Sequence, residues 1–130
     1  MQTRTIPIGE WRPFLDGFSR QHDGWLVNVE VDSLEYGAQP EIEDLPLAGI
    51  SADTVSAGEG TIEIFVGREP DQRATHTIAH ATGLALEQAE SGADVALQVK
   101  AADGTATLLR FRAPALPETV DHVVAMRTRR

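Results

Sequence analysis

Two histidines four residues apart, His76 and His80, form the spacing in this chain with the most direct chemical meaning. On a helix, that spacing places two imidazole rings on one face, where they can bind zinc. The residues around them instead predict a strand, in which four residues span roughly 13 Å, so that only a bulge would bring both rings to one ion. We therefore expect no metal, and we retain His76 and His80 as candidate ligand-binding residues.

Arg110 and Arg112 form a second candidate pair. They alternate with Leu109 and Phe111, so in a strand the two guanidinium groups share the face opposite the apolar side chains. Such a pair is suited to binding a carboxylate or a phosphate group. The alternative is ion pairing with the 20 Asp and Glu residues of the chain itself. The candidate ligand-binding set is therefore His76, His80, Arg110 and Arg112.

Three other patterns fall short of a catalytic motif. Gly49-Ile50-Ser51 begins like the nucleophile elbow of serine hydrolases, but Asp53 stands where the elbow has its last glycine. Glu41 and Glu43 share one face of a possible strand, yet they lack the apolar neighbours that adapt a carboxyl pair to catalysis. Gly58-Glu59-Gly60 is not followed by the Lys-Ser or Lys-Thr of a phosphate-binding loop. We predict no catalytic residues and no cofactor, although the 4 histidines leave a serine triad open on residue inventory alone.

The composition narrows the class of protein. A formal net charge of −9 and an aromatic content of 5% both disfavour nucleic acid as a partner. The chain has no cysteine, which excludes disulfides and thiol chemistry, and no apolar run long enough for a membrane span or a signal peptide. We expect a single domain over residues 1–130, located in the cytoplasm, with neither nucleic acid nor membrane as a partner.

The structural element that the sequence predicts most clearly is a hairpin over residues 93–111. Its two runs place alternate apolar residues on either side of Asp103-Gly104. A two-residue turn would set arginines opposite the apolar face, whereas a three-residue loop pairs Val99 with Thr107, Leu97 with Leu109 and Val95 with Phe111. We choose the second register, which requires Gly104 in the left-handed region and leaves Arg110 and Arg112 on the outer face.

An amphipathic helix is predicted before the hairpin, and further strands lie between the two. The helix is expected from Gly9 to Arg20, with its regular part beginning near Trp11, because apolar residues recur at helical spacing and Pro13 suits only a first turn. Alternation predicts strands at residues 25–31, 61–66 and 75–88, the last bent or bulged at Gly83.

The remaining segments are less regular. Residues 32–40 read as a loop or an irregular hairpin, and residues 41–52 as an edge strand kinked around Pro46. A short helix is expected after Pro117. The whole predicts an α+β fold in which about six mostly antiparallel strands roll into a small barrel-like sheet, with an N-terminal amphipathic helix and a short C-terminal helix. An open antiparallel sheet covered by both helices is the alternative.

Several stretches together resemble the small bacterial proteins catalogued as domain of unknown function 5335. The resemblance spans nearly the whole chain, and its most specific motif is Leu108-Leu109-Arg110-Phe111-Arg112-Ala113-Pro114-Ala115-Leu116-Pro117-Glu118. It is also carried by Ile6-Pro7 with Trp11, Gly24-Trp25, Leu45 to Asp53, and His76-Thr77-Ile78. The resemblance implies a bacterial protein of one domain, and it implies no activity or catalytic residues.

Two functional hypotheses follow from these observations. The first is a non-enzymatic binding or protein-interaction module, which forms homo-oligomers or binds a protein partner through a barrel edge or a helix face. The second is a small enzyme or anionic-ligand-binding protein that uses His76 or His80 with Arg110 or Arg112 around a pocket at the open end of the sheet. The absence of a complete catalytic motif favours the first.

Overall fold

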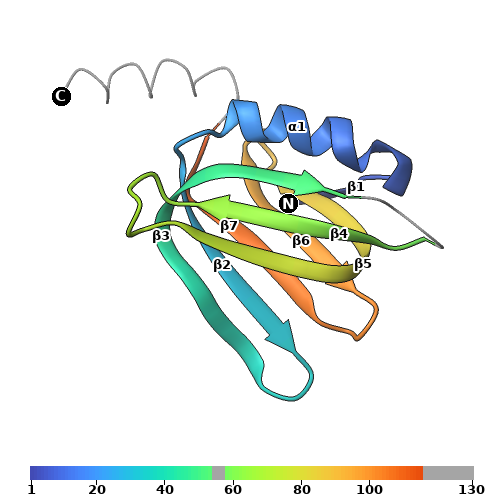
Figure 1. Ribbon diagram of the computed structural model, residues 1–130. Helices are drawn as coiled ribbons and strands as arrows, with labels where there is room; N and C mark the ends of the chain where they lie inside the picture. The colour runs from blue at the N-terminus through green and yellow to red at the C-terminus, as the bar shows by residue number, and fades with distance from the viewer. Residues whose placement is uncertain (54–57, 116–130) are drawn as a thin grey trace.

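A computed structural model describes residues 1–53 and 58–115, which form a closed β-barrel with a helix across one end (Figure 1). The elements, in chain order, are β1 (Gln2–Thr5), the 3-10 turn η1 (Ile8–Glu10), α1 (Trp11–Gln21), β2 (Leu26–Ser33), β3 (Gly37–Ala52), β4 (Gly60–Val66), β5 (Ala74–Gln88), β6 (Asp94–Ala101) and β7 (Ala106–Ala115).

The barrel is an antiparallel meander that closes on itself. Each strand from β2 to β7 pairs with the next along the chain, and β7 returns to pair with β2. The long strand β5 is shared, because residues 74–81 pair with β4 and residues 81–88 pair with β6. Near its end, β5 also pairs with the added strand β1. The predicted barrel of about six mostly antiparallel strands is therefore confirmed, and the open-sheet alternative is wrong.

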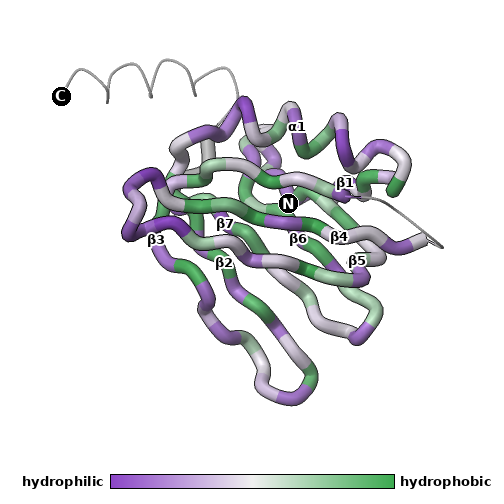
Figure 2. The backbone as a smooth tube through the Cα atoms, in the orientation of Figure 1, coloured by the Kyte–Doolittle hydropathy of each residue, from purple (hydrophilic) through white to green (hydrophobic). Residues whose placement is uncertain are grey.

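The core fills the barrel interior and the space beneath α1. Strand β4 shows the pattern most simply, since buried residues alternate with half-exposed ones along its whole length. Hydrophobic residues also occur between hydrophilic ones along the other strands of the barrel, with less regular spacing (Figure 2). Three residues of α1, Trp11, Leu15 and Phe18, are buried and cover one end of the barrel.

Helix α1 begins at Trp11, as the sequence predicts, and Pro13 occupies its first turn. Two polar contacts fix the helix on the barrel. The Trp11 indole Nε1 donates to the Ile6 carbonyl at 2.9 Å, and the Ser19 hydroxyl accepts the Ile50 N–H at 2.9 Å. The helix is therefore held by hydrogen bonds as well as by its apolar face.

The β6–β7 hairpin has the predicted register. Leu97 pairs with Leu109 and Val99 with Thr107, and Gly104 has a φ of 90° in the turn. The register shifts between Asp94 and Ala96, so Val95 is only partly buried and does not share the inner face. The inner-face assignment of Val95 and its predicted pairing with Phe111 are the parts of the hairpin prediction that are wrong.

Strand β3 corrects the prediction of a kinked edge strand. It is part of the barrel wall, where residues 37–46 pair with β2 and residues 47–52 pair with β4, so that, in the part of the chain that the structure describes, its first half has a free edge. The kink is real, but it lies at Asp44, which has a φ of 51° and donates its N–H to the Asn28 side chain at 3.0 Å. Pro46 fits beside this kink. Its carbonyl accepts the Gly67 N–H at 2.8 Å, so proline keeps its acceptor in the sheet and lacks only the N–H donor.

Other segments differ from expectation in smaller ways. The irregular hairpin around residues 32–40 is part of β2 and β3, joined by a short turn. The expected bend at Gly83 is present as a register shift between β5 and β6. Strand β1 was not predicted, because its four exposed residues carry no periodic apolar pattern. The predicted C-terminal helix lies outside the described residues.

Candidate functional site

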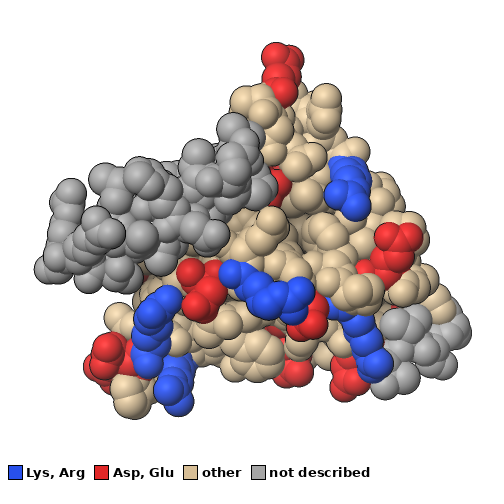
Figure 3. Space-filling model, turned by 90° about the horizontal axis from the view of Figure 1, so that it is seen from above, with Lys and Arg blue, Asp and Glu red and all other residues tan. Residues whose placement is uncertain are grey.

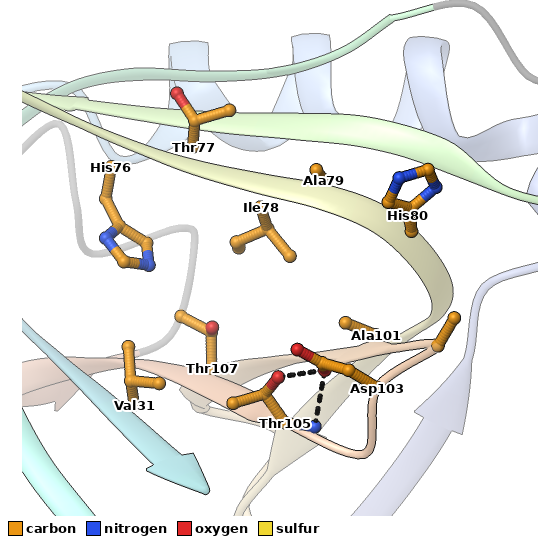
Figure 4. Close-up of a pocket in the computed structure, with 11 residues that line it drawn as sticks. Val31, His76, Thr77, Ile78, Ala79, His80, Ala101, Asp103, Thr105 and Thr107 are labelled. Carbon is orange, nitrogen blue, oxygen red and sulfur yellow. Dashed lines mark hydrogen bonds between the residues drawn. The ribbon is translucent and has the colours of Figure 1, made fainter.

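The end of the barrel opposite α1 opens into a hollow of about 400 Å³, which we call the mouth (Figure 4). It is lined by Val31 of β2, residues 76–80 of β5, residues 101–103 and Thr105 of the β6–β7 turn region, and Thr107 of β7. In Figure 4, His76, Ile78 and Thr107 point into the space between β5 and the β6–β7 hairpin. The mouth therefore combines an apolar floor with imidazole and hydroxyl groups.

A bulge in β5 shapes one wall of the mouth. Ile78 pairs with Ile62, but the next pair is Ala81 with Gly60, so β5 carries one more residue than β4 here. Ile78 and Ala81 are both buried, and His80, between them, has a φ of 55°. The bulge turns the His80 ring outward, where its Nδ1 lies 3.0 Å from a Glu59 carboxylate oxygen.

The β6–β7 turn forms the facing wall. Asp103 accepts hydrogen bonds from the hydroxyl of Thr105 and from the Thr105 backbone N–H, the latter at 2.9 Å. These two bonds lower the pKa of the Asp103 carboxyl, so it is ionised at neutral pH. The rim of the mouth thus carries a fixed negative charge.

The structure brings together two of the four sequence-predicted site residues. His76 and His80 both line the mouth. A bulged strand brings them there, and not the face of a helix. Arg110 and Arg112 lie elsewhere on the outer surface, where they pair with Glu30 and Asp44, each at 3.9 Å. Within residues 1–53 and 58–115, no group of three or more His, Cys, Asp or Glu is placed to hold a metal ion.

Arg110 and Arg112 form ion pairs with acidic residues of the chain, as the ion-pairing alternative predicts. More than half of each side chain is exposed to solvent, 56% for Arg110 and 61% for Arg112. Ion pairs also occur on the α1 side of the molecule, between Arg12 and Asp53, Arg20 and Asp16, and Arg68 and Asp23. Seen from that side, acidic and basic side chains are interspersed (Figure 3).

A second constellation lies beneath the end of α1 and was not singled out from the sequence. His22 is fully buried, and its Nδ1 lies 2.8 Å from the Phe18 carbonyl, so Nδ1 carries the proton of that hydrogen bond. Its Nε2 lies 3.1 Å from a carboxylate oxygen of Asp94, without a hydrogen bond of good geometry. This contact is a buried pair of an imidazole ring and a carboxylate.

The surroundings of His22 are aromatic. Its ring stacks on Phe111 at 4.6 Å and lies 4.3 Å from Phe18, while Trp25 meets it edge-on at 4.8 Å. Asp94 is also buried, and it accepts the Gln88 side-chain amide at 3.0 Å. The pair therefore ties the end of α1 to the start of β6, inside a closed aromatic cluster.

The pKa of Asp94 reflects opposing influences. Burial raises it, but the contact with His22, the hydrogen bond from Gln88 and the charge of Arg4 lower it by more, so the net shift is downward. Asp94 also lines a groove of about 720 Å³ between α1 and the barrel, to which Arg4 contributes. Because the His22 ring itself is fully buried, we assign the pair a structural role.

A signal for His22 was present in the sequence. Phe18 and His22 are four residues apart, so His22 continues the stripe of Trp11, Leu15 and Phe18 along the buried face of the helix. Asp94 gave no comparable signal, because it follows a turn that is already acidic.

The comparisons with known proteins agree on one family. A family model described as "Family of unknown function (DUF5335)" matches residues 2–120. A protein of Aquifex aeolicus (strain VF5), described as uncharacterized, is 32% identical over 117 residues, which cover 90% of this chain and 97% of the relative. No solved structure matches the chain. Among the described residues, no helix combines the length and apolarity that crossing a membrane requires.

Proposed function

The chain belongs to the DUF5335 family of unknown function, and from its geometry we propose that it is a non-enzymatic binding protein that holds its ligand in the mouth of the barrel. The observation that carries this proposal is the mouth itself, a hollow of about 400 Å³ at the end that α1 leaves uncovered. Pockets that bind ligands are concave and mostly apolar, with a few placed polar groups, and the mouth has this composition.

The rigidity of the walls supports binding. Val31 and Thr107 face each other across the β2–β7 ladder, which closes the barrel. Ile78 is held between its paired neighbour on β4 and the core. A pocket whose walls are fixed before the ligand arrives avoids the entropy loss of ordering them on binding.

Binding fits the polar groups of the mouth better than catalysis does. His80 and Glu59 pair in solvent, with 74% and 38% of their side chains exposed. Asp103 is satisfied by Thr105. Catalytic groups derive most of their effect from preorganised charges in a site that excludes water, and these pairs lie at an open rim.

A ligand screen by nuclear magnetic resonance tests the proposal. We expect members of a small-molecule and short-peptide library to shift the backbone amide signals of Val31, Ile78 and Thr107 in a saturable way. Ala101→Phe fills the mouth and should abolish these shifts, while Ala38→Phe, on an exposed part of β3 outside the mouth, should leave them unchanged. Shifts that centre elsewhere, or that survive Ala101→Phe, would contradict the proposal.

The proposal extends to location and partners. A cytoplasmic location is supported by the absence of cysteine, and the Aquifex relative supports a bacterial origin. The net charge of −9 supports a partner other than nucleic acid or an anionic membrane surface. Homo-oligomerisation is tested by light scattering over a range of concentrations, and a monomeric mass throughout would exclude it.

A further inference from the structure

The mouth is bordered by a strand edge that lacks a partner. Residues 74–78 of β5 pair with β4 on one side, and β6 pairs with β5 only from residue 81 onward. Within residues 1–53 and 58–115, no strand lies on the β6 side of residues 74–79. In an antiparallel ladder, every second residue directs its N–H and C=O away from its partner. This part of β5 therefore presents unpaired backbone donors and acceptors.

The mouth follows this edge closely. The face of a strand would contribute alternate residues to a pocket, but five consecutive residues, His76 to His80, line the mouth. The unpaired stretch of β5 ends at His80, whose carbonyl accepts the Ala102 N–H at 2.9 Å. Val31 and Thr107 form the opposite wall (Figure 4). The space beside the edge is thus a slot with a backbone on one side and apolar and hydroxyl side chains on the other.

The edge of β5 lacks two of the usual protections, proline and charged side chains. Exposed strand edges are commonly guarded by proline or by charged side chains, which prevent another strand from pairing. Residues 74–80 contain no proline, lysine, arginine, aspartate or glutamate. Residues 37–44 of β3, which pair with β2 but not with β4, carry Pro40, Glu41 and Glu43. The contrast between the two edges points to a β5 edge that is kept open for pairing.

We propose that the ligand of the mouth is an extended peptide segment of another protein, which pairs as an added strand with residues 74–79 of β5. The inference rests on the proposed function and names its ligand class. Backbone hydrogen bonds supply affinity in this mode, and alternate side chains enter the pocket. Ile78, Val31 and Ala101 select apolar side chains at those positions.

The charges around the mouth favour lysine or arginine at the intervening positions. Asp103 lines the mouth, Glu59 pairs with the lining residue His80, and Glu63 accepts a hydrogen bond from Thr77 at 3.4 Å. The lining residues include no lysine or arginine. The net charge of −9 also accelerates the approach of a basic segment.

A second copy of this chain fits the slot less well than a single strand does. The β2–β3 hairpin projects beyond the rest of the barrel (Figure 1), and the β6–β7 turn lines the mouth together with the edge of β5. Two barrels that paired through β5 would each have to accommodate these projections of the other. A single extended segment has no such obstacle.

The test uses acetylated and amidated hexapeptides in which valine and lysine alternate, added to the full chain. We expect saturable shifts in the amide signals of residues 75–79. N-methylation removes backbone donors one at a time, and in a strand only every second donor is used. Methylation of one alternate set should weaken binding at least tenfold, and methylation of the other set should change it less than threefold.

Variants of the chain test the charge preference. Asp103→Asn and Glu59→Gln should each weaken the lysine peptide severalfold but not the same peptide with norleucine in place of lysine. Glu10→Gln, in the turn before α1, is the matched control and should have no effect.

The outcomes separate the inference from the proposed function. If small molecules shift the mouth residues while no peptide does, the binding function stands and strand addition is wrong. Peptide binding without a difference between the two methylated sets would also overturn strand addition, since it would show recognition by side chains alone. A dimer that forms through β5 would overturn it in favour of a second copy. If nothing shifts the mouth residues, both proposals fail.

Discussion

Replacement of Asp94 by asparagine tests the buried pair beneath α1. The change keeps the size of the side chain and the oxygen that accepts the Gln88 amide at 3.0 Å, but it removes the negative charge 3.1 Å from His22 Nε2. His22 is fully buried, so solvent replaces the lost partner only partly, through the groove that Asp94 lines. We expect the variant to fold with the same barrel and to unfold more readily.

The expected loss at neutral pH follows from the burial of the pair. Removal of one partner from a buried ion pair costs roughly 3–5 kcal/mol. Because Asp94 also lines the open groove under α1, some solvent reaches the site, and we expect the lower end, about 3 kcal/mol. The groups around Asp94 lower its pKa in the folded state. Its contribution is therefore present above the unfolded pKa of about 4 and is lost as the pH falls through the folded value.

Urea unfolding followed by tryptophan fluorescence measures this loss, since the Trp25 ring contacts His22 at 4.8 Å. The control is Asp16→Asn, which breaks a pair with Arg20 whose side chains are 77% and 74% exposed and should cost less than about 0.5 kcal/mol. The difference between the wild type and Asp94→Asn should shrink below about pH 4. A cost no larger than that of the control at pH 7, or a difference that grows in acid, would refute the stabilising role of the contact between His22 and Asp94.

Three further predictions concern stability, each measured as the free energy of unfolding in urea. Gly67→Ala should cost well over about 2 kcal/mol, because φ is 92° and the new Cβ would lie 2.6 Å from a carbonyl oxygen. Gly104→Ala should cost about 1 kcal/mol, because φ is 90° but the nearest atom to the new Cβ is in a side chain at 3.5 Å. Equal losses for the two variants would contradict the role of the close approach to the carbonyl oxygen. Ser19→Ala should cost about 1–2 kcal/mol, since it leaves the N–H of the buried Ile50 without its acceptor at 2.9 Å, and an unchanged stability would show that water replaces the hydroxyl. Arg110→Ala should change stability by less than about 0.5 kcal/mol, because its pair with Glu30 is long, 3.9 Å, and exposed, and a larger loss would show that the pair supports the barrel.

The hairpin was predictable because its information is local. Alternation fixed which residues of β6 and β7 face inward, and the turn around Gly104 fixed their register. Strand β3 was harder, because its kink depends on the Asn28 side chain, which β2 brings into contact with Asp44. No pattern within residues 41–52 encodes a contact made by another strand.

The site was predictable only in part, because it too depends on contacts between segments that are distant in the sequence. His76 and His80 were singled out by a spacing typical of metal sites, and they line the mouth because a bulge and a free edge place them there. The ligand-binding potential of that edge belongs to the backbone, which no residue type signals. The contact between His22 and Asp94 joins a helix end to a strand start, so it exists only once the barrel is assembled.

The closure of the barrel by β7 and β2 also has a consequence for how the chain folds. Phe111 pairs with Val27, a separation of 84 residues (111 minus 27), while every other ladder of the meander joins neighbouring strands. The entropy lost in closing that loop has to be met before the last ladder contributes, so its formation is expected to limit the folding rate.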